Sequence, residues 1–275
     1  MGRMSRPILP LLLAFVMATP TAAWSQDDAS DWVLTRLPEA KTVVATISFT
    51  NGLHLVSRCQ DGVYDLIVQG LPEVRGVKRE LAFQVGEGGE SKTSVWSVGT
   101  SQSVAFSRIP AQVARDLAAG GELQIIVPPE EEGGRRTRYV MDIAPSSTAI
   151  EQTLNACGRP LVDPRMAGVD EVDGNGQDGL PAFIQWRAAP RPSFPAPVGG
   201  RMPNQGYVVL TCLTKDDGSL SDCQTESEVP RGYNLGRAVE RALPRARVAL
   251  TDEAAASGAD LAGRMISFSV NFELR

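Results

Sequence analysis

Apolar and polar residues alternate most regularly near the end of the chain, between residues 266 and 274. The apolar positions, which would share one face of a strand, are Ile266, Phe268, Val270, Phe272 and Leu274. The polar positions between them are Ser267, Ser269, Asn271 and Glu273. A period of two is typical of a strand with one face in a core and the other in water. We therefore expect a half-buried strand here.

Two β-rich segments, 206–214 and 219–223, flank the dipeptide Asp217-Gly218. Asp-Gly is a preferred two-residue hairpin loop, because both central residues must take positive φ. With the loop at these two residues, Cys212 faces Cys223, and directly opposed residues lie within reach of a disulfide. A longer, bulged loop would shift this register by one residue. The pattern predicts an antiparallel hairpin with a disulfide across it.

A short amphipathic helix is predicted between this hairpin and the last strand. Asn234 precedes it as a possible cap, and Pro244 ends or kinks it. The apolar residues that share its inner face are Leu235, Ala238, Val239, Ala242 and Leu243. The order strand, strand, helix, strand lets the helix cover one face of a three-stranded antiparallel sheet. We expect a small α+β sandwich over residues 192–275.

The first half of the chain predicts a β-rich domain over residues 27–160. The expected strands are 42–50, 53–59, 63–68, 80–85, 94–98, 122–127 and 138–143. Tight-turn dipeptides at 51–52 and 61–62 join the first three of them as an antiparallel meander. Two short helices are expected as well, at 110–119 and from about 147 to 157, the second with a possible capping box of Thr148 and Glu151. The fold class is therefore α+β, a β-rich meander with two short helices followed by the small sandwich.

Residues 161–191 differ in composition from both halves, being polar and rich in glycine and proline. Such a stretch predicts a flexible linker between two domains. Within it, the stretch Asp173-Gly174-Asn175 is similar to the start of a calcium loop. The twelfth position of that loop is Ile184, however, where the loop requires a bidentate glutamate. A linker is therefore favoured over a calcium site.

The N-terminal residues 1–25 have the pattern of a secretory signal peptide. Arg3 and Arg6 precede an apolar run from 8 to 18, and small residues suited to cleavage follow it. The apolar run is about half as long as a membrane-spanning helix needs, so an integral span after cleavage is not expected; an uncleaved anchor is the alternative. Without Arg3 and Arg6, 25 basic residues face 32 acidic ones, a formal net charge of −7. An exported, acidic chain is a poor candidate for binding nucleic acid or an anionic membrane surface.

The four cysteines all follow the signal segment. Exported chains oxidise their thiols, so an even number predicts two disulfides. The hairpin assigns one to Cys212 and Cys223, which leaves Cys59 for Cys157. Cys157 shares a predicted helix face with Ile150 and Leu154, so this disulfide would tie the second helix of the first domain to its second strand.

Few residues indicate an enzyme. The single histidine, His54, could be half of a Ser-His pair, but a strand histidine that faces solvent or makes a local hydrogen bond is favoured. No phosphate loop, dinucleotide motif or zinc ligand set is present, so we expect no cofactor and no metal. Residues 130–132 are acidic and face Arg135 and Arg136 as a solvated hairpin tip. Paired carboxylates elsewhere in the first domain stay open as an alternative.

The second half resembles a known family in four pieces that occur in its order. They are Phe194-Pro195, the glycine-led hairpin from Gly206 to Leu220, the helix from Leu235 to Leu243, and the closing strand from Gly263 to Leu274. Together they resemble the C-terminal domain of TonB-like energy transducers, over about residues 192–275. The chain departs from that family at 244–248, where the family has an aromatic-rich segment. It also lacks the family's long Pro-rich spacer.

The resemblance implies a periplasmic domain without chemistry of its own, which adds a segment of an outer-membrane receptor to the free edge of its sheet. Main-chain hydrogen bonds give such strand addition its affinity. By resemblance, the candidate recognition edge is the strand of Ile266, Phe268, Val270, Phe272 and Leu274. We expect a periplasmic, non-enzymatic adaptor of a Gram-negative envelope that binds an envelope protein. The alternatives are an envelope hydrolase with a carboxylate site in the first domain and a true transducer with an uncleaved anchor.

Overall fold

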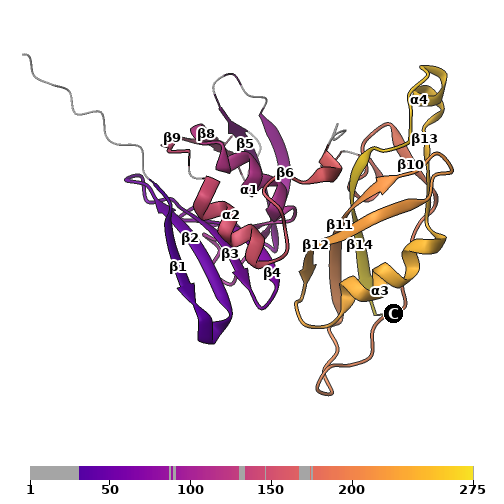
Figure 1. Ribbon diagram of the computed structural model, residues 1–275, viewed down its shortest axis with the longest axis horizontal. Coiled ribbons are helices and arrows are strands. Elements are labelled where there is room, and N and C mark those ends of the chain that lie inside the picture. The colour runs from indigo at the N-terminus through magenta and orange to yellow at the C-terminus, as the bar shows by residue number, and fades with distance from the viewer. Residues whose placement is uncertain are drawn as a thin grey trace, which may run out of the picture.

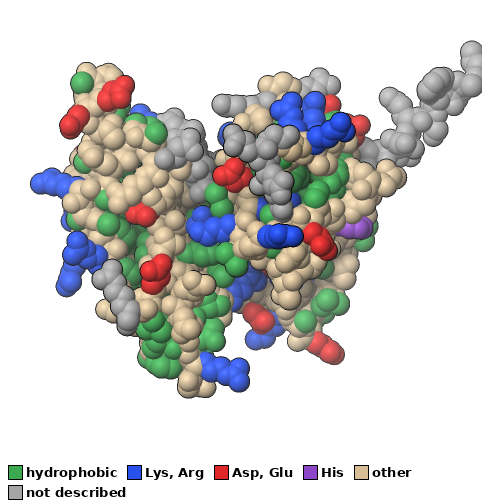
Figure 2. Space-filling view, turned by 180° about the vertical axis from the view of Figure 1, so that it is seen from behind, with side chains coloured by type: hydrophobic (Ala, Val, Ile, Leu, Met, Phe, Trp, Pro, Cys, Tyr) green, Lys and Arg blue, Asp and Glu red, His purple; other side chains and the backbone are tan. Residues whose placement is uncertain are grey.

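The computed structural model describes residues 31–274 except 87, 89, 90, 130–133, 146, 167–173 and 175. The predicted signal peptide, the acidic hairpin tip at 130–132 and two residues of the rejected calcium loop, 173 and 175, lie outside the described residues. The chain forms two lobes that lie side by side (Figure 1). Seen from the opposite side, Lys and Arg side chains gather where the lobes meet (Figure 2). All strand pairs are antiparallel among the described residues.

The first lobe is built on a nine-stranded sheet with the order β1-β2-β3-β4-β7-β6-β5-β8-β9. Its strands are β1 (Val33–Leu37), β2 (Thr42–Ser48), β3 (His54–Gln60), β4 (Val63–Gln69), β5 (Lys78–Val85), β6 (Lys92–Val98), β7 (Ala105–Ser107), β8 (Gly121–Val127) and β9 (Thr137–Ile143). A 3-10 turn, η1 (Pro38–Ala40), joins β1 to β2. The seven predicted strands are all present. The meander continues only through β4, however, because the short strand β7 pairs with β4 and separates it from β6 and β5.

Helices α1 (Pro110–Ala118) and α2 (Ser147–Ala156) pack on this sheet and bury their apolar residues. Ile150 and Leu154 of α2 are fully buried, as the predicted helix face requires. The predicted capping box is wrong, because the helix already begins at Ser147 and Thr148 lies inside it. The N-cap is the residue just before the first helical residue, and Thr148 is the second residue of the helix.

The second lobe contains the predicted three-stranded sheet, with the order β12-β11-β14. Its strands are β11 (Gln205–Thr214), β12 (Leu220–Val229) and β14 (Met265–Glu273), with β10 (Ile184–Ala188) and β13 (Arg247–Leu250) as a separate two-stranded ribbon. The helical segments are η2 (Pro164–Met166), η3 (Gln177–Gly179), α3 (Leu235–Ala242), η4 (Leu243–Arg245) and α4 (Asp252–Ala256). Helix α3 covers the face of the sheet formed by Val208, Leu210, Phe268 and Val270.

Helix α3 begins as predicted, but its cap is different. Asn234 has a left-handed backbone and its side chain makes no capping bond. Instead, Glu228 at the end of β12 accepts hydrogen bonds from the backbone N–H groups of Gly236, at 2.9 Å, and Tyr233, at 3.3 Å. A carboxylate at a helix N-terminus satisfies unpaired N–H groups and complements the helix dipole.

The connection at 161–191 was predicted as a flexible linker, and in its described part this is wrong. Leu180 and Ile184 are buried in the core of the second lobe, and β10 pairs with β13. Asp163 and Arg165 are buried as well. This stretch contains short apolar segments among its glycines and prolines, and these segments pack on the second lobe. The second lobe therefore begins before residue 192.

The hairpin between β11 and β12 has a three-residue loop, Asp216 to Gly218, and the predicted two-residue loop is wrong. Lys215 N–H donates to the carbonyl of Ser219 at 2.9 Å, and Gly218 takes φ of 75°. Thr214 therefore faces Leu220, one residue away from the predicted register. A three-residue loop with a left-handed glycine is the next most common hairpin connection.

A bulge restores the register before the cysteines. Asp222 takes positive φ of 47°, and beyond it Thr211 faces Gln224, as the two-residue loop had required. Cys212 and Cys223 form a disulfide with a Cα–Cα distance of 4.1 Å. The second disulfide joins Cys59 in β3 to Cys157 at the end of α2, with a Cα–Cα distance of 5.6 Å. Both pairs are the predicted ones, and both fit an extracytoplasmic, oxidising location.

Removal of the two disulfides should destabilise the protein unequally. The Cys59–Cys157 loop spans 98 residues and the Cys212–Cys223 loop 11. In the loop-entropy model, the free energy of unfolding falls by about 4 to 5 kcal/mol without the first disulfide and by about 3 kcal/mol without the second. Urea denaturation of the two double Cys→Ala variants measures this order. Equal losses, or a larger loss for the short loop, would contradict it.

Candidate functional site

Strand β14 forms an open edge of the sheet in the second lobe. Among the described residues, β11 is the only strand that pairs with it. Thr214 N–H donates to the Arg264 carbonyl at one end of this pair, and Leu274 N–H donates to the Asn204 carbonyl at the other, both at 2.9 Å. In an antiparallel pair, hydrogen-bonded and non-hydrogen-bonded residues alternate. Even-numbered residues of β14 therefore bond to β11, and odd-numbered residues direct their N–H and C=O groups to the open edge.

The outward main-chain groups belong to Ser267, Ser269, Asn271 and Glu273. These are the residues that the sequence analysis assigned to the polar face, not those it named for recognition. The side chains of Ile266, Phe268, Val270 and Phe272 are buried in the core beneath α3, and only Leu274, 47% exposed, lies outside it. The apolar residues anchor the strand in the core, and the main-chain groups of the polar residues form the open edge.

The polar face of β14 is not uniformly wet, which corrects the prediction of a solvated face. Ser267 is 1% exposed. Turn η3 lies against the strand, and Ser269 Oγ donates to the Asp178 carbonyl at 3.1 Å. The first half of the edge is therefore covered by the segment that enters the second lobe, and the accessible part runs from Val270 to Glu273.

A small groove lies beside this accessible part. It has a volume of about 220 Å³ and is lined by Asp178, Trp186, Ala189 and Pro190 opposite Ser269, Val270 and Asn271. The ring of Trp186 packs edge to face on Phe268, with centroids 5.0 Å apart. Its buried Nε1–H has no hydrogen-bond partner among the described residues.

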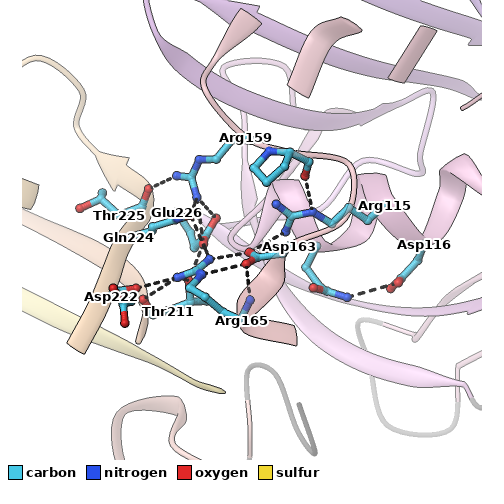
Figure 3. Close-up of polar contacts among 12 residues, drawn as sticks. Arg115, Asp116, Arg159, Asp163, Arg165, Thr211, Asp222, Gln224, Thr225 and Glu226 are labelled. Atoms are coloured by element: carbon cyan, nitrogen blue, oxygen red, sulfur yellow. Dashed lines mark hydrogen bonds and ion pairs between the residues drawn. The ribbon is translucent and has the colours of Figure 1, made fainter. Parts of the chain in front are cut away.

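The opposite edge of the sheet, along β12, is closed by two arginines (Figure 3). Arg165 Nη1 donates to the Asp222 carbonyl at 2.9 Å, and Arg159 Nη2 donates to the Thr225 carbonyl at 2.5 Å. Both arginines belong to the segment that leaves the first lobe. Their guanidinium groups take two carbonyl acceptors that a strand added to β12 would need, so of the two edges of this three-stranded sheet β14 is the one that suits strand addition.

A buried polar network holds these arginines. Asp163 accepts from Arg165 Nη2 at 2.7 Å and lies 3.3 Å from Arg115 Nη1 of α1. Glu226 of β12 lies 3.2 Å from Arg159 Nη1 and accepts from Thr211 Oγ1 at 2.5 Å. The carboxylate side chains of Asp163 and Glu226 are 1% and 4% exposed. Three guanidinium groups and two carboxylates leave one net positive charge in this network.

The network perturbs the ionisation of its members. Burial alone would raise the pKa of Asp163, but the hydrogen bonds and charges of Arg165 and Arg115 outweigh it and hold this pKa below its ordinary value. Burial also lowers the pKa of Arg115. Because its donors and acceptors largely satisfy one another, this cluster joins the lobes and offers no free acid or base for catalysis.

Two further contacts join the lobes. Asp65 of β4 accepts from Arg231 Nη1 of the second lobe at 2.9 Å, and it also pairs with Arg58 at 2.7 Å. The guanidinium group of Arg108 lies 4.7 Å from the ring centroid of Tyr207, and the Tyr207 hydroxyl hydrogen-bonds to Ser97. The first lobe is thus fixed against the second by charged and polar groups at three places.

His54 and the carboxylates of the first lobe lie apart, because His54 does not line the cavity that contains Glu73 and Glu80. His54 is exposed in β3, and its Nδ1 lies 2.7 Å from Ser48 Oγ, with no carboxylate bonded to the ring among the described residues. The first lobe has a cavity of about 340 Å³ in which Glu73 and Glu80 lie beside Arg79 and Arg135. Within the described ranges, no group of three or more His, Cys, Asp or Glu could hold a metal ion.

Substitution of Arg165 by methionine should destabilise the protein strongly. The change keeps much of the side-chain volume but removes the main partner of the buried Asp163 carboxylate, which then keeps only Arg115 at 3.3 Å, and it also removes the longer contact of Arg165 to Glu226 at 3.8 Å. Breaking a buried ion pair from one side costs about 3 to 5 kcal/mol. Arg187→Met, at an exposed arginine, is the control and should change the free energy of unfolding by about 0.5 kcal/mol or less. Similar urea midpoints for the two variants would contradict a tightly coupled network.

Acid should weaken the interface through Asp163. Its folded-state pKa is lowered, so its contribution to stability is complete above its unfolded pKa of about 3.9 and is lost as the pH falls through the folded value. The free energy of unfolding of the wild type should therefore decline below about pH 4. Asp163→Asn should be less stable at pH 7 and decline less steeply in acid. Parallel curves for the two proteins would show that Asp163 does not contribute.

Comparison with protein-family models, with curated proteins and with solved structures found no match to this chain. No helix in the described part of the chain combines the length and the apolarity needed to cross a membrane. The geometry of the second lobe, with one closed and one open sheet edge, is therefore the evidence on which a function can be argued.

Proposed function

We propose that this chain is a periplasmic, non-enzymatic adaptor whose second lobe binds an extended segment of an envelope protein along β14. The observation that carries the proposal is the outward N–H and C=O of Asn271 and Glu273, on an edge that no described strand covers. Strand addition needs such unpaired main-chain groups, and it needs little from the side chains of the receiving strand. The adjacent groove adds a pocket for one side chain of the ligand.

We also propose that the second lobe is a domain similar to the C-terminal domain of TonB-like energy transducers. A helix over a three-stranded antiparallel sheet, with the last strand at an edge, is what the resemblance implied. The ribbon of β10 and β13 and the disulfide in the hairpin are features of this chain. The disulfides and the signal-like N-terminal sequence support a periplasmic location, in which an outer-membrane receptor is one candidate partner.

The first lobe has a supporting role in this proposal. Its exit segment closes the β12 edge and covers the first half of β14, so a ligand strand is restricted to residues 270–273. An unprotected edge on both sides of a sheet invites pairing between identical chains. Closure of one edge and half of the other leaves a short, selective docking position.

Proline at position 271 tests this proposal. Asn271 directs its N–H outward, so Asn271→Pro removes a donor for the ligand without removing one from the β11 ladder, whereas proline at Val270 would break that ladder. Prolines are tolerated on edge strands for this reason. Asn271→Ala, which keeps the N–H, is the matched control. Circular dichroism must show that both variants are folded.

The measurement is capture of envelope proteins by the full mature chain, followed by titration with a peptide from the captured protein. Loss of one main-chain hydrogen bond and the bulk of the ring should weaken binding about tenfold or more for Asn271→Pro. Asn271→Ala should bind like the wild type. Equal binding by all three proteins would exclude β14 as the docking edge, and capture of nothing by the wild type would count against the adaptor function itself.

A further inference from the structure

The second lobe has another groove besides the one beside β14. Its volume is about 740 Å³, and it lies between residues 187–193 and the end of α3 with η4. Four arginines line it: Arg187, Arg191, Arg241 and Arg245. It shares only Ala189 with the lining of the groove beside β14. A ligand could therefore occupy it independently of a strand on β14.

None of these four arginines pairs with a carboxylate among the described residues, and all four are exposed. The neighbouring Arg247 is different, because it donates to the carbonyls of Pro244 at 2.9 Å and Ala246 at 2.7 Å. Arg247 thus binds the carbonyl groups at the end of the helical segment, and Arg241 and Arg245 are available to a ligand in the groove. None of the described residues that line the groove is an aspartate or a glutamate.

The concentration of charge is unusual for this protein, whose formal net charge is −5. Two arginines come from each wall, four positions apart in sequence on both. Like charges close together repel, and a concave surface focuses their field on the space between the walls. Lys and Arg side chains project on the outer side of this lobe, away from the first lobe (Figure 2). An anion between the walls would relieve the repulsion.

The rest of the lining favours a phosphate group over an acidic peptide. The other residues are alanines, Ser193, Pro192 and Pro244. The two prolines have no N–H that could pair with the main chain of a bound peptide. Phosphate oxygens need only guanidinium groups, which bind them in a bidentate, charge-assisted geometry.

We propose that this groove binds a ligand with two or more phosphate groups, contacted from both walls by the four arginines. Lipid headgroups and soluble oligophosphates share this chemistry. A lipid source would place the second lobe at a membrane surface while β14 stays free for its partner. The site does not depend on strand addition at β14.

Binding of two probes to the full mature chain tests this inference. The first is tripolyphosphate, followed by calorimetry, and the second is co-sedimentation with vesicles of phosphatidylglycerol, with phosphatidylcholine vesicles as the neutral reference. The double variant Arg187→Gln/Arg241→Gln, with one change on each wall, should weaken binding about tenfold or more. The control is Arg237→Gln/Arg36→Gln, which removes the same charge at arginines outside the lining and should retain the affinity of the wild type.

Binding of both probes supports the phosphate site, and binding of the anionic vesicles alone supports it with a lipid as the source. Tripolyphosphate binding without vesicle binding supports it with a soluble ligand. The inference is overturned if neither probe binds, if the control pair loses as much affinity as the groove pair, or if a hexaglutamate peptide binds more tightly than tripolyphosphate.

Discussion

The structure depends on the buried ion pairs between Arg165 and Asp163 and between Arg159 and Glu226. Buried charges are costly to desolvate, and they persist only where partners satisfy them with good geometry. Here the partners come from α1, from the segment after Cys157 and from β11 and β12. The same arginines bond to main-chain carbonyls of β12. One set of contacts therefore joins the lobes, orders the start of the connection and closes a sheet edge.

Because the β12 edge is closed, β14 is the edge of this sheet on which another chain could pair. A three-stranded sheet has two edges, and each presents main-chain groups that can pair with another chain. The first lobe occupies the β12 edge, and η3 covers the beginning of β14. The open part is residues 270–273 of β14, where every second residue directs its main-chain N–H and C=O outward, beside a small groove that Trp186 lines. This arrangement suits a single extended segment in one position, and it does not require any catalytic residue.

Much of the fold could be predicted from the sequence, because it depends on local patterns. Turn dipeptides and alternation located the strands of the first lobe, and helical periodicity located α2 and α3. The disulfide of Cys212 was predicted from a loop of the wrong length, and the pairing held because the bulge at Asp222 compensates for the extra loop residue. Strands β1, β7, β10 and β13 were missed, because they are short and lack a clear alternation.

The site was harder to predict, because its features depend on register and on contacts distant in sequence. Alternation shows which side chains of β14 face the core, but only the pairing with β11 shows that Asn271 faces outward. Nothing in the sequence links Arg165 to Glu226, which lie 61 positions apart. Amide hydrogen exchange of the free protein tests the open edge most directly. We expect the amides of Asn271 and Glu273 to exchange rapidly and those of Val270 and Phe272 to be protected; equal protection of all four would contradict an open β14 edge.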